Sequence, residues 1–173
     1  CVCKVFLCCS RFGQNRTLLK YLMFSQSDFV FMSEAIELAK KAALSDEVPV
    51  GAVITLDNKI IGRGFNQVIS KNDVTAHAEI LAIRDASKNL KNYRLNNACM
   101  YVTLEPCHMC AKALIDARLS RLVYSAFEPK TGAIHSIDHI FDKPFNHKID
   151  YQHGLLQEES SILLKDFFKS KRH

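Results

Sequence analysis

The chain has 173 residues, 48% hydrophobic and 24% charged, which is the size and composition of one domain with a single core. No apolar run approaches the roughly 20 residues of a membrane helix, and no signal-peptide pattern is present, so we expect a cytoplasmic protein without membrane association. The net charge of +5 says little about partners, because the segment before residue 23 is basic and the remainder is about neutral.

The first 22 residues differ in character from the rest of the chain. They contain four of the seven cysteines, no acidic residue and no clear helical or strand period. We expect residues 1–22 to be a disordered or non-native leader and residues 23–173 to be the folded domain. A metal-binding cysteine tract is the alternative interpretation. The uneven spread of cysteines argues against a secreted disulfide scaffold.

The first half of the domain predicts a helix, a hairpin and a second helix. The helix spans about 28–44 and is indicated by apolar residues at helical spacing, namely Met32, Ile36, Ala39 and Ala43. Strands are predicted at 50–56 and 59–65, joined by a tight turn. The second helix is predicted at 76–87, with Thr75 as its N-cap.

The second half continues the alternation of strands and helices. Strands are predicted at 100–104 and 122–126, with a weaker one at 148–151. A helix should start at Pro106 and run to about 118. A short helix is expected near 136–141, inside a loop-rich stretch, and a final amphipathic helix at 157–170. This order predicts a mixed sheet covered by helices on both faces.

Two short segments carry residue types that bind metals. His77 lies at the start of one predicted helix, and Cys107 and Cys110 lie at the start of another. Cysteines three residues apart share a helix face, and the free N–H groups at a helix start favour their thiolates. One His and two Cys ligands leave one tetrahedral zinc position open, as in catalytic sites. We therefore predict one Zn²⁺ per subunit, held by these three residues.

Glu79 follows His77 by two residues and is predicted to be the catalytic acid–base group. A carboxylate beside a zinc-activated water can accept its proton and pass it on. Other interpretations are a redox C-x-x-C pair, or a structural zinc site in which Cys99 or His108 supplies the fourth ligand. The combined H-x-E and P-C-x-x-C pattern is typical of zinc nucleobase deaminases and favours the catalytic site.

Beyond this pattern, the sequence resembles the bacterial tRNA adenosine deaminases, within the cytidine and deoxycytidylate deaminase superfamily. The resemblance runs in register from about Val30 to Arg172 and leaves out the first 22 residues. The segments that carry it are 47–53, 75–80, 92–95, 101–110, 130–133, 146–147 and 166–168. The zinc pattern is shared with cytosine, guanine and deoxycytidylate deaminases, whereas the Asn-Tyr-Arg-Leu, Lys-Thr-Gly and Asp-Phe-Phe pieces point to the tRNA enzymes.

This resemblance implies an α/β fold of the cytidine-deaminase type, a three-layer α/β/α sandwich with a mixed five-stranded sheet. It also implies hydrolysis of adenosine to inosine at the wobble position of a tRNA anticodon loop, with Glu79 as proton shuttle. The alternative function is a free-base or nucleotide deaminase acting on guanine, cytosine or deoxycytidylate. The expected partners are the tRNA anticodon stem-loop and a second subunit. The apolar stretch 111–115 supports the homodimer, although it also suits packing on the sheet.

Four substrate-contacting residues are implied by position in the resemblance. Asn66 should contact the target nucleotide, Val48 should line the base pocket, and Glu128 should lie near the ribose of the loop. Phe168 should touch RNA near the end of the last helix. Residue pattern alone gives them ordinary structural roles: a strand-end turn residue, a core residue, a surface acid and part of a helix with a basic tip.

Overall fold

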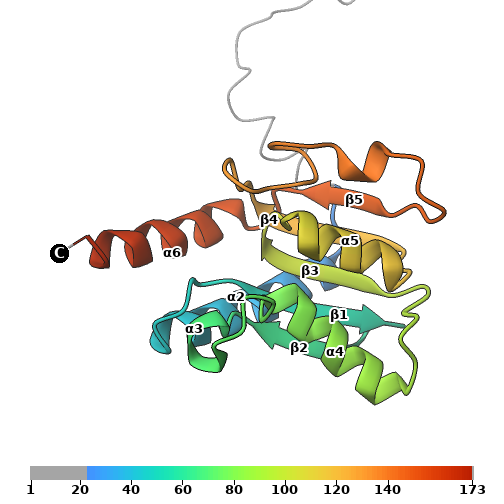
Figure 1. The fold of residues 1–173 in the computed structure, drawn as a ribbon, viewed down its shortest axis with the longest axis horizontal. Coiled ribbons are helices and arrows are strands. Elements are labelled where there is room, and N and C mark those ends of the chain that lie inside the picture. The colour runs from blue at the N-terminus through green and yellow to red at the C-terminus, as the bar shows by residue number, and fades with distance from the viewer. Residues whose placement is uncertain (1–22, 173) are drawn as a thin grey trace, which may run out of the picture.

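The computed structural model describes residues 23–172, and the leader expected at residues 1–22 lies outside this part of the chain. Five strands form one sheet in the order β2-β1-β3-β4-β5 (Figure 1). In chain order they are β1 (Gly51–Leu56), β2 (Lys59–Phe65), β3 (Cys99–Leu104), β4 (Arg121–Ala126) and β5 (Asp150–His153). β1 pairs antiparallel with β2 and β3, whereas β4 pairs parallel with β3 and β5, so the sheet is mixed as predicted.

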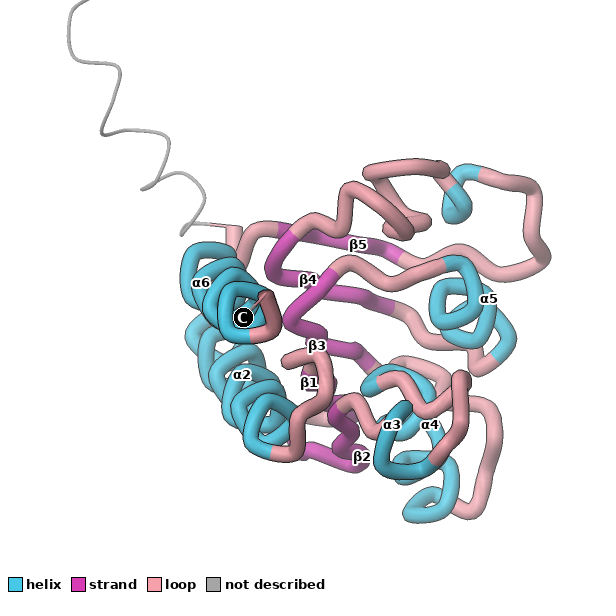
Figure 2. The backbone as a smooth tube through the Cα atoms, turned by 60° about the vertical axis from the view of Figure 1, so that its left-hand side comes forward, coloured by secondary structure: helices cyan, strands magenta, loops and turns pink. Residues whose placement is uncertain are grey.

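Helices cover both faces of this sheet. α2 (Gln26–Leu44) and α6 (Gln157–Ser170) lie on one face, and α4 (Ala78–Leu90) and α5 (His108–Asp116) lie on the other (Figure 2). Each face has its own buried apolar cluster against the sheet. The predicted three-layer α/β/α arrangement is therefore confirmed. Within residues 23–172, no helix is long and apolar enough to cross a membrane.

The observed bounds of the opening helix, the hairpin and the last helix agree with the predicted bounds to within two residues. α2 begins after Ser25, whose hydroxyl accepts the N–H of Asp28, while the Asp28 carboxylate accepts the N–H of Ser25. This reciprocal capping box fixes the first turn. α6 has the predicted bounds. Its apolar residues are half-buried except Ile162 and Phe168, which are 51% and 46% exposed.

The helix that follows the hairpin starts later than predicted. α4 begins at Ala78, and its N-cap residue is His77 rather than Thr75. The hydroxyl and N–H of Thr75 both donate to Asp73 Oδ1, at 2.7 and 2.8 Å. Thr75 therefore closes a local turn, because short polar side chains compete with the helix for backbone partners.

The helix after β3 shows the same offset. α5 begins at His108, with Cys107 as its N-cap, so Pro106 precedes the cap instead of opening the helix. The prediction that Pro106 occupies the first helical position is therefore wrong by two residues. His77 and Cys107 consequently hold equivalent N-cap positions on two helices of the same face.

Three short elements also differ from the predictions. α3 (Val68–Lys71) lies between β2 and α4, where the sequence predicts no element. A single 3-10 turn, η1 (Ile140–Asp142), replaces the helix expected near 136–141. β5 lies two residues beyond the predicted strand at 148–151. Elements of three or four residues contain too little periodicity for their bounds to be read from the pattern.

The apolar stretch 111–115 does not provide the subunit surface expected of it. Ala111, Leu114 and Ile115 are buried within the chain's own core, where they face the sheet. The support that this stretch gave to a homodimer is therefore wrong, because its apolar side chains are already covered.

Two glycines let α4 approach β2 very closely. A Cβ on Gly64 would lie 2.1 Å from the carbonyl oxygen of Ala78, and one on Gly62 would lie 2.5 Å from that of Ala82. Real side chains cannot occupy such distances, so only glycine permits this spacing. The first turn of α4, with His77 before it, is thereby held directly against the sheet.

On the opposite face, a buried ion pair joins α2 to the sheet. Asp28, 2% exposed, accepts two hydrogen bonds from the Arg121 guanidinium, at 2.7 and 3.2 Å. The Tyr101 hydroxyl donates to the same carboxylate at 2.6 Å. Burial alone would raise the pKa of Asp28, but the hydrogen bonds from Arg121, Tyr101 and Ser25 outweigh it and lower the pKa to about 2.

We predict that Asp28→Asn lowers the free energy of unfolding by about 2–4 kcal/mol at pH 7, because it leaves Arg121 without its charged partner. A carboxyl whose pKa is lower in the folded state stabilises above its unfolded pKa. The difference from the parent should therefore shrink as the pH falls from about 4 to about 2. Urea unfolding at pH 7 and pH 3 measures this, with the exposed Asp116→Asn as control. A cost under about 0.5 kcal/mol at pH 7, typical of surface changes, would contradict it.

Candidate metal and catalytic site

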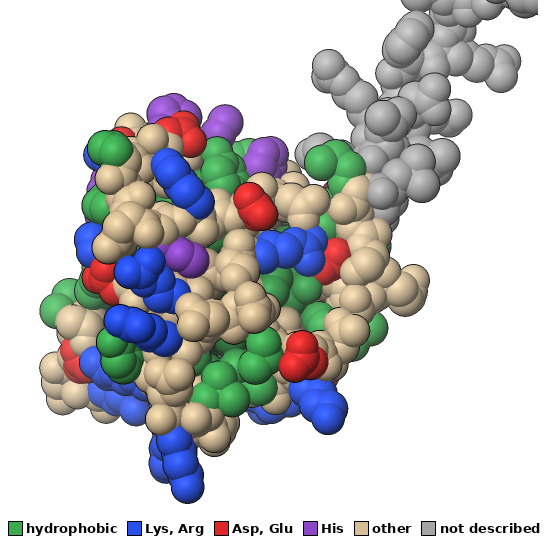
Figure 3. All heavy atoms as spheres, turned by 90° about the vertical axis from the view of Figure 1, so that its right-hand side faces the viewer, with side chains coloured by type: hydrophobic (Ala, Val, Ile, Leu, Met, Phe, Trp, Pro, Cys, Tyr) green, Lys and Arg blue, Asp and Glu red, His purple; other side chains and the backbone are tan. Residues whose placement is uncertain are grey.

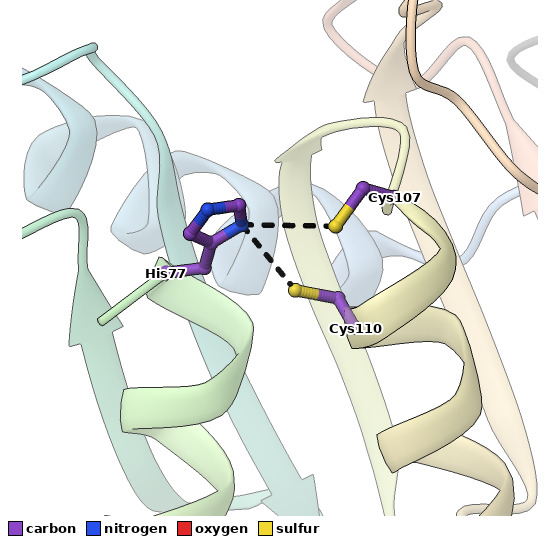
Figure 4. A group of neighbouring side chains, drawn as sticks. All are labelled: His77, Cys107 and Cys110. Atoms are coloured by element: carbon purple, nitrogen blue, oxygen red, sulfur yellow. Dashed lines mark hydrogen bonds between the residues drawn. The ribbon is translucent and has the colours of Figure 1, made fainter. Parts of the chain in front are cut away.

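Three potential metal ligands converge where α4 and α5 begin. His77 caps α4, Cys107 caps α5, and Cys110 follows in the first turn of α5 (Figure 4). The Nδ1 atom of His77 lies 3.8 Å from the Sγ of Cys107 and 3.5 Å from the Sγ of Cys110. All three ligand atoms lie within 4.8 Å of one another. The sequence prediction that these residues form one cluster is consistent with this geometry.

The spacing of these atoms fits a zinc ion. Tetrahedral bonds of about 2.0–2.1 Å to nitrogen and about 2.3 Å to sulfur place N and S about 3.5 Å apart and the two S atoms about 3.8 Å apart. The observed N–S distances of 3.5 and 3.8 Å need little adjustment. The donor set of one imidazole and two thiols also suits zinc.

Hydrogen bonding between the two cysteines shifts their pKa values in opposite directions. Donation from the Cys110 thiol, together with His77, lowers the pKa of Cys107 to about 4. The same hydrogen bond and burial raise the pKa of Cys110. The hydrogen bond with Cys107 raises the pKa of His77 against the effect of burial. A cation between the three side chains would favour both thiolates, so metal binding here should release protons.

Cys99 and His108 do not join this cluster. Cys99 packs with the apolar cluster on the α2 face of the sheet. His108 is exposed, and its Nε2 lies 3.2 Å from Asp138 Oδ2. Among the residues that the structure describes, the metal-ligand group therefore has three members. A tetrahedral zinc ion held by these three would keep one position open for water or substrate.

Glu79 lies beside the three ligands without belonging to their group. It is the second residue of α4 and only 4% exposed. Burial is the main reason that its pKa is raised, with a further contribution from the Cys107 charge. A buried carboxyl with a raised pKa can accept and release protons during a reaction.

Asn66 is the predicted substrate residue that the structure ties most directly to the cluster. It follows β2, is buried, and its Oδ1 accepts the N–H of Ala78 at 2.9 Å. The Asn66 amide is therefore fixed to the backbone of Ala78, the residue between His77 and Glu79. Val48 is half-buried and packs against the core cluster under α4 and α5, an arrangement that also suits an ordinary core residue.

The other two predicted contacts lie farther out. Glu128 is half-buried in the loop after β4, and its Oε1 accepts the N–H of Lys130 at 2.9 Å. Phe168 lies near the end of α6, which projects beyond the sheet in Figure 1, and its ring meets that of Phe167 edge-on at 5.5 Å. Neither side chain belongs to the metal cluster.

Two buried carboxylates near the site are absent from the sequence predictions. Glu47 accepts the N–H groups of Ile69 and Ser70, at 3.2 and 2.7 Å, and so caps α3. Glu105 accepts five hydrogen bonds from the loop after β4. Their only sequence signal is an acidic residue beside an apolar strand with no basic residue next to it.

The chain matches the family model of MafB19-like deaminases over residues 26–172. It is 49% identical over 150 residues to the tRNA-specific adenosine deaminase of Haemophilus influenzae, covering 86% of this chain and 87% of that protein. The protein of the same name from Agrobacterium fabrum is 48% identical, with 82% and 94% covered. That from Bacillus subtilis is 41% identical, with 84% and 91% covered.

Solved structures of deaminases share this fold. One comes from a study of A-to-I editing by tRNA:A34 deaminases at the wobble position of transfer RNA. It is 47% identical, with a TM-score of 0.76, over 78% of this chain and 98% of that one. A guanine deaminase from Nitrosomonas europaea has a TM-score of 0.72 over 80% and 83% of the two chains. At 23% identity it shows the shared fold alone.

We predict that Cys107→Ala removes most of the bound zinc from the purified protein, because two protein ligands hold the ion far less tightly than three. Metal analysis by mass spectrometry of parent and variant measures the loss. Cys99→Ala, which removes a cysteine on the other face of the sheet, is the matched control and should retain the parental content. An unchanged zinc content in Cys107→Ala would contradict the assignment of Cys107 as a ligand.

Proposed function

The chain belongs to the family of tRNA-specific adenosine deaminases, and on that premise we propose that it hydrolyses adenosine to inosine at the wobble position of a tRNA anticodon loop. The identity of 49% across 86% of the chain carries this proposal. The metal cluster alone would not, because deaminases of free bases use the same ligand pattern. The free-base alternative is less favoured, since the guanine deaminase is only 23% identical.

The site would hold its metal through His77, Cys107 and Cys110. A zinc ion bound there supplies an acidified water as the nucleophile for C6 of adenine. Glu79 then moves the protons. Its carboxylate accepts a proton from the attacking water and delivers it to N1 of the ring. Glu79 then takes a second proton from the hydroxyl now on C6 and passes it to the amino group, which leaves as ammonia while C6 becomes the carbonyl of hypoxanthine.

Asn66 and the burial of Glu79 prepare this proton transfer. The hydrogen bond from Ala78 to Asn66 fixes the start of α4, so Glu79 needs little reorganisation when substrate binds. With Glu79 only 4% exposed, solvent is kept from the transferred protons. An anticodon loop already presents unstacked bases, so the target can enter this enclosed site at small cost.

The RNA is expected at the edge of the sheet where α4 and α5 begin. Figure 3 shows the opposite end of the molecule, toward which α4 and α5 run. Lys and Arg are scattered there among acidic and neutral side chains, without one continuous basic surface. Around the site, Asn66, Val48 and Glu128 are the proposed contacts with the nucleotide. Phe168, on the exposed side of α6, is the proposed contact farther along the RNA. A tRNA substrate also accords with the cytoplasmic location expected from the sequence.

We predict that Glu79→Ala slows inosine formation by at least about 10²–10⁴-fold, because one general acid–base group typically contributes that much. Zinc content and tRNA affinity should change little, since the three ligands and the outer contacts remain. Single-turnover inosine formation, metal analysis and a tRNA binding curve give the three quantities. The exposed Glu37→Ala on α2 is the matched control.

The mechanism would be wrong if Glu79→Ala kept its zinc and reacted within about tenfold of the parent, because a proton shuttle contributes more than that. Loss of zinc from the variant would instead show that Glu79 supports the metal site. Either result is distinct from failure of the parent to form inosine.

We further propose that the active unit is a homodimer. Three exposed apolar residues lie close in sequence to the metal ligands, namely Ile69, Val74 and Met109. A second subunit could cover them. The predicted result of sedimentation at micromolar concentration is a dimer. A monomer that retains full activity on tRNA would rule the dimer out as the active unit.

A further inference from the structure

One loop lies directly against the first metal-binding cysteine. The segment from Glu128 to Ser136 follows β4, and its Gly132 forms an antiparallel bridge with Cys107. The N–H of Ala133 donates to the carbonyl oxygen of Pro106 at 2.9 Å. The 128–136 loop is thus attached to the strand–helix junction that carries Cys107.

The Glu105 carboxylate accepts hydrogen bonds from backbone N–H groups at both ends of this loop. Oε1 accepts three successive N–H groups, those of Ile134, His135 and Ser136, at 3.1, 2.7 and 2.9 Å. Oε2 accepts the N–H of Glu128 at 3.1 Å and the hydroxyl of Ser136. Three consecutive N–H groups directed at one oxygen form an anion-binding nest. Both ends of the loop are therefore bound to one side chain.

This arrangement requires a charged carboxylate at position 105. Glu105 is 3% exposed, and all five of its hydrogen-bond partners are donors, four N–H groups and one hydroxyl. A protonated carboxyl would turn an O–H group toward one of these donors. A glutamine could not replace it, because either orientation of its amide would turn an NH₂ group toward at least two donors.

Gly132 shows that the loop is shaped around this carboxylate. A Cβ at position 132 would lie 2.4 Å from the Cδ of Glu105 and 2.5 Å from its Oε2. It would also lie 2.6 Å from the carbonyl oxygen of Glu128. Any larger residue would push the carboxylate away from its donors, so Gly132 and Glu105 act as one unit.

The outer side of the loop carries exposed polar side chains. Lys130, Thr131 and His135 are exposed, and they offer a positive charge, a hydroxyl and an imidazole. These groups donate hydrogen bonds to phosphate and stack on bases, the contacts by which single-stranded RNA loops are recognised. Their distance from the metal site is fixed only while the loop stays bound to Glu105.

We propose that Glu105 is a positioning residue for RNA. It holds the 128–136 loop as the RNA-facing wall of the site and makes no contact with the reacting atoms. This inference rests on the proposed function, because it assigns the wall to an RNA substrate. It separates Glu105 from Glu79, which acts on the protons of the reaction.

The test compares Glu105→Gln with the parent full-length protein. Glu105→Gln releases the loop from its anchor. The tRNA concentration that gives half of the maximal single-turnover rate should therefore rise by about tenfold, while the maximal rate itself should change by less than about threefold. Amide hydrogen exchange in the 128–136 segment should become about tenfold faster. Zinc content should stay at the parental level. Asp116→Asn, which removes an exposed acid paired with Lys112, should change neither the half-saturating concentration nor exchange in this loop.

Two further variants keep the test decisive if Glu105→Gln does not fold. Ser136→Ala removes one of the five donors and should give a smaller increase in the same direction. Gly132→Ala keeps the carboxylate but displaces it, and should resemble Glu105→Gln.

The proposal is overturned if loop exchange is unchanged in these variants, or if exchange accelerates while the half-saturating tRNA concentration stays within about twofold of the parent. Loss of zinc would also overturn it, because Glu105 would then act on the metal. If the parent forms no inosine, the proposed function fails, and hydrogen exchange still decides whether Glu105 holds the loop.

Discussion

The site depends first on how closely α4 can lie against β2. The missing side chains of Gly62 and Gly64 leave room for the backbone of α4, whose facing residues Ala78, Ala82 and Ala86 are themselves small and fully buried. This contact fixes the start of α4 at the edge of the sheet where β3 ends and α5 begins. Since His77 is the N-cap of α4 and Cys107 that of α5, the packing of two helices brings the metal ligands together. A helix standing off by the thickness of one methyl group would separate the imidazole from the thiols.

Buried carboxylates then fix the parts of the chain that the sheet does not hold. Asp28 ties α2 to β4 through Arg121, Glu47 caps α3, and Glu105 gathers the loop after β4. Each is buried, and each charge is satisfied by several donors, which is the condition under which a buried charge is tolerated. Two of the three act on segments that flank the metal cluster. Glu79 differs from them, because burial raises its pKa and leaves it able to exchange protons.

The parts of this structure that repeat over many residues could be predicted from the sequence. Periodicity gave α2, the hairpin and the last helix, and the residue types at 77, 107 and 110 indicated the metal cluster before any geometry was known. Helix starts were less predictable, because Thr75 and Asp73 form a turn that competes with a cap at Thr75. The loop anchors could not be predicted, since Glu105 meets donors 23 to 31 residues away in the chain and nothing local marks that pairing. The apolar stretch 111–115 has the composition of a subunit surface, yet the sheet already covers it.

The central claim is that this cluster and its carboxyl act on one adenosine of a folded RNA. The most direct test is to incubate unmodified total tRNA with the purified full-length protein and to map inosine at single-nucleotide resolution. Free adenosine, guanine and cytosine are assayed in parallel for ammonia release. The account predicts inosine at the wobble position, little elsewhere in the tRNA, and no comparable turnover of the free compounds. Rapid deamination of a free base, with no inosine at the wobble position, would contradict it.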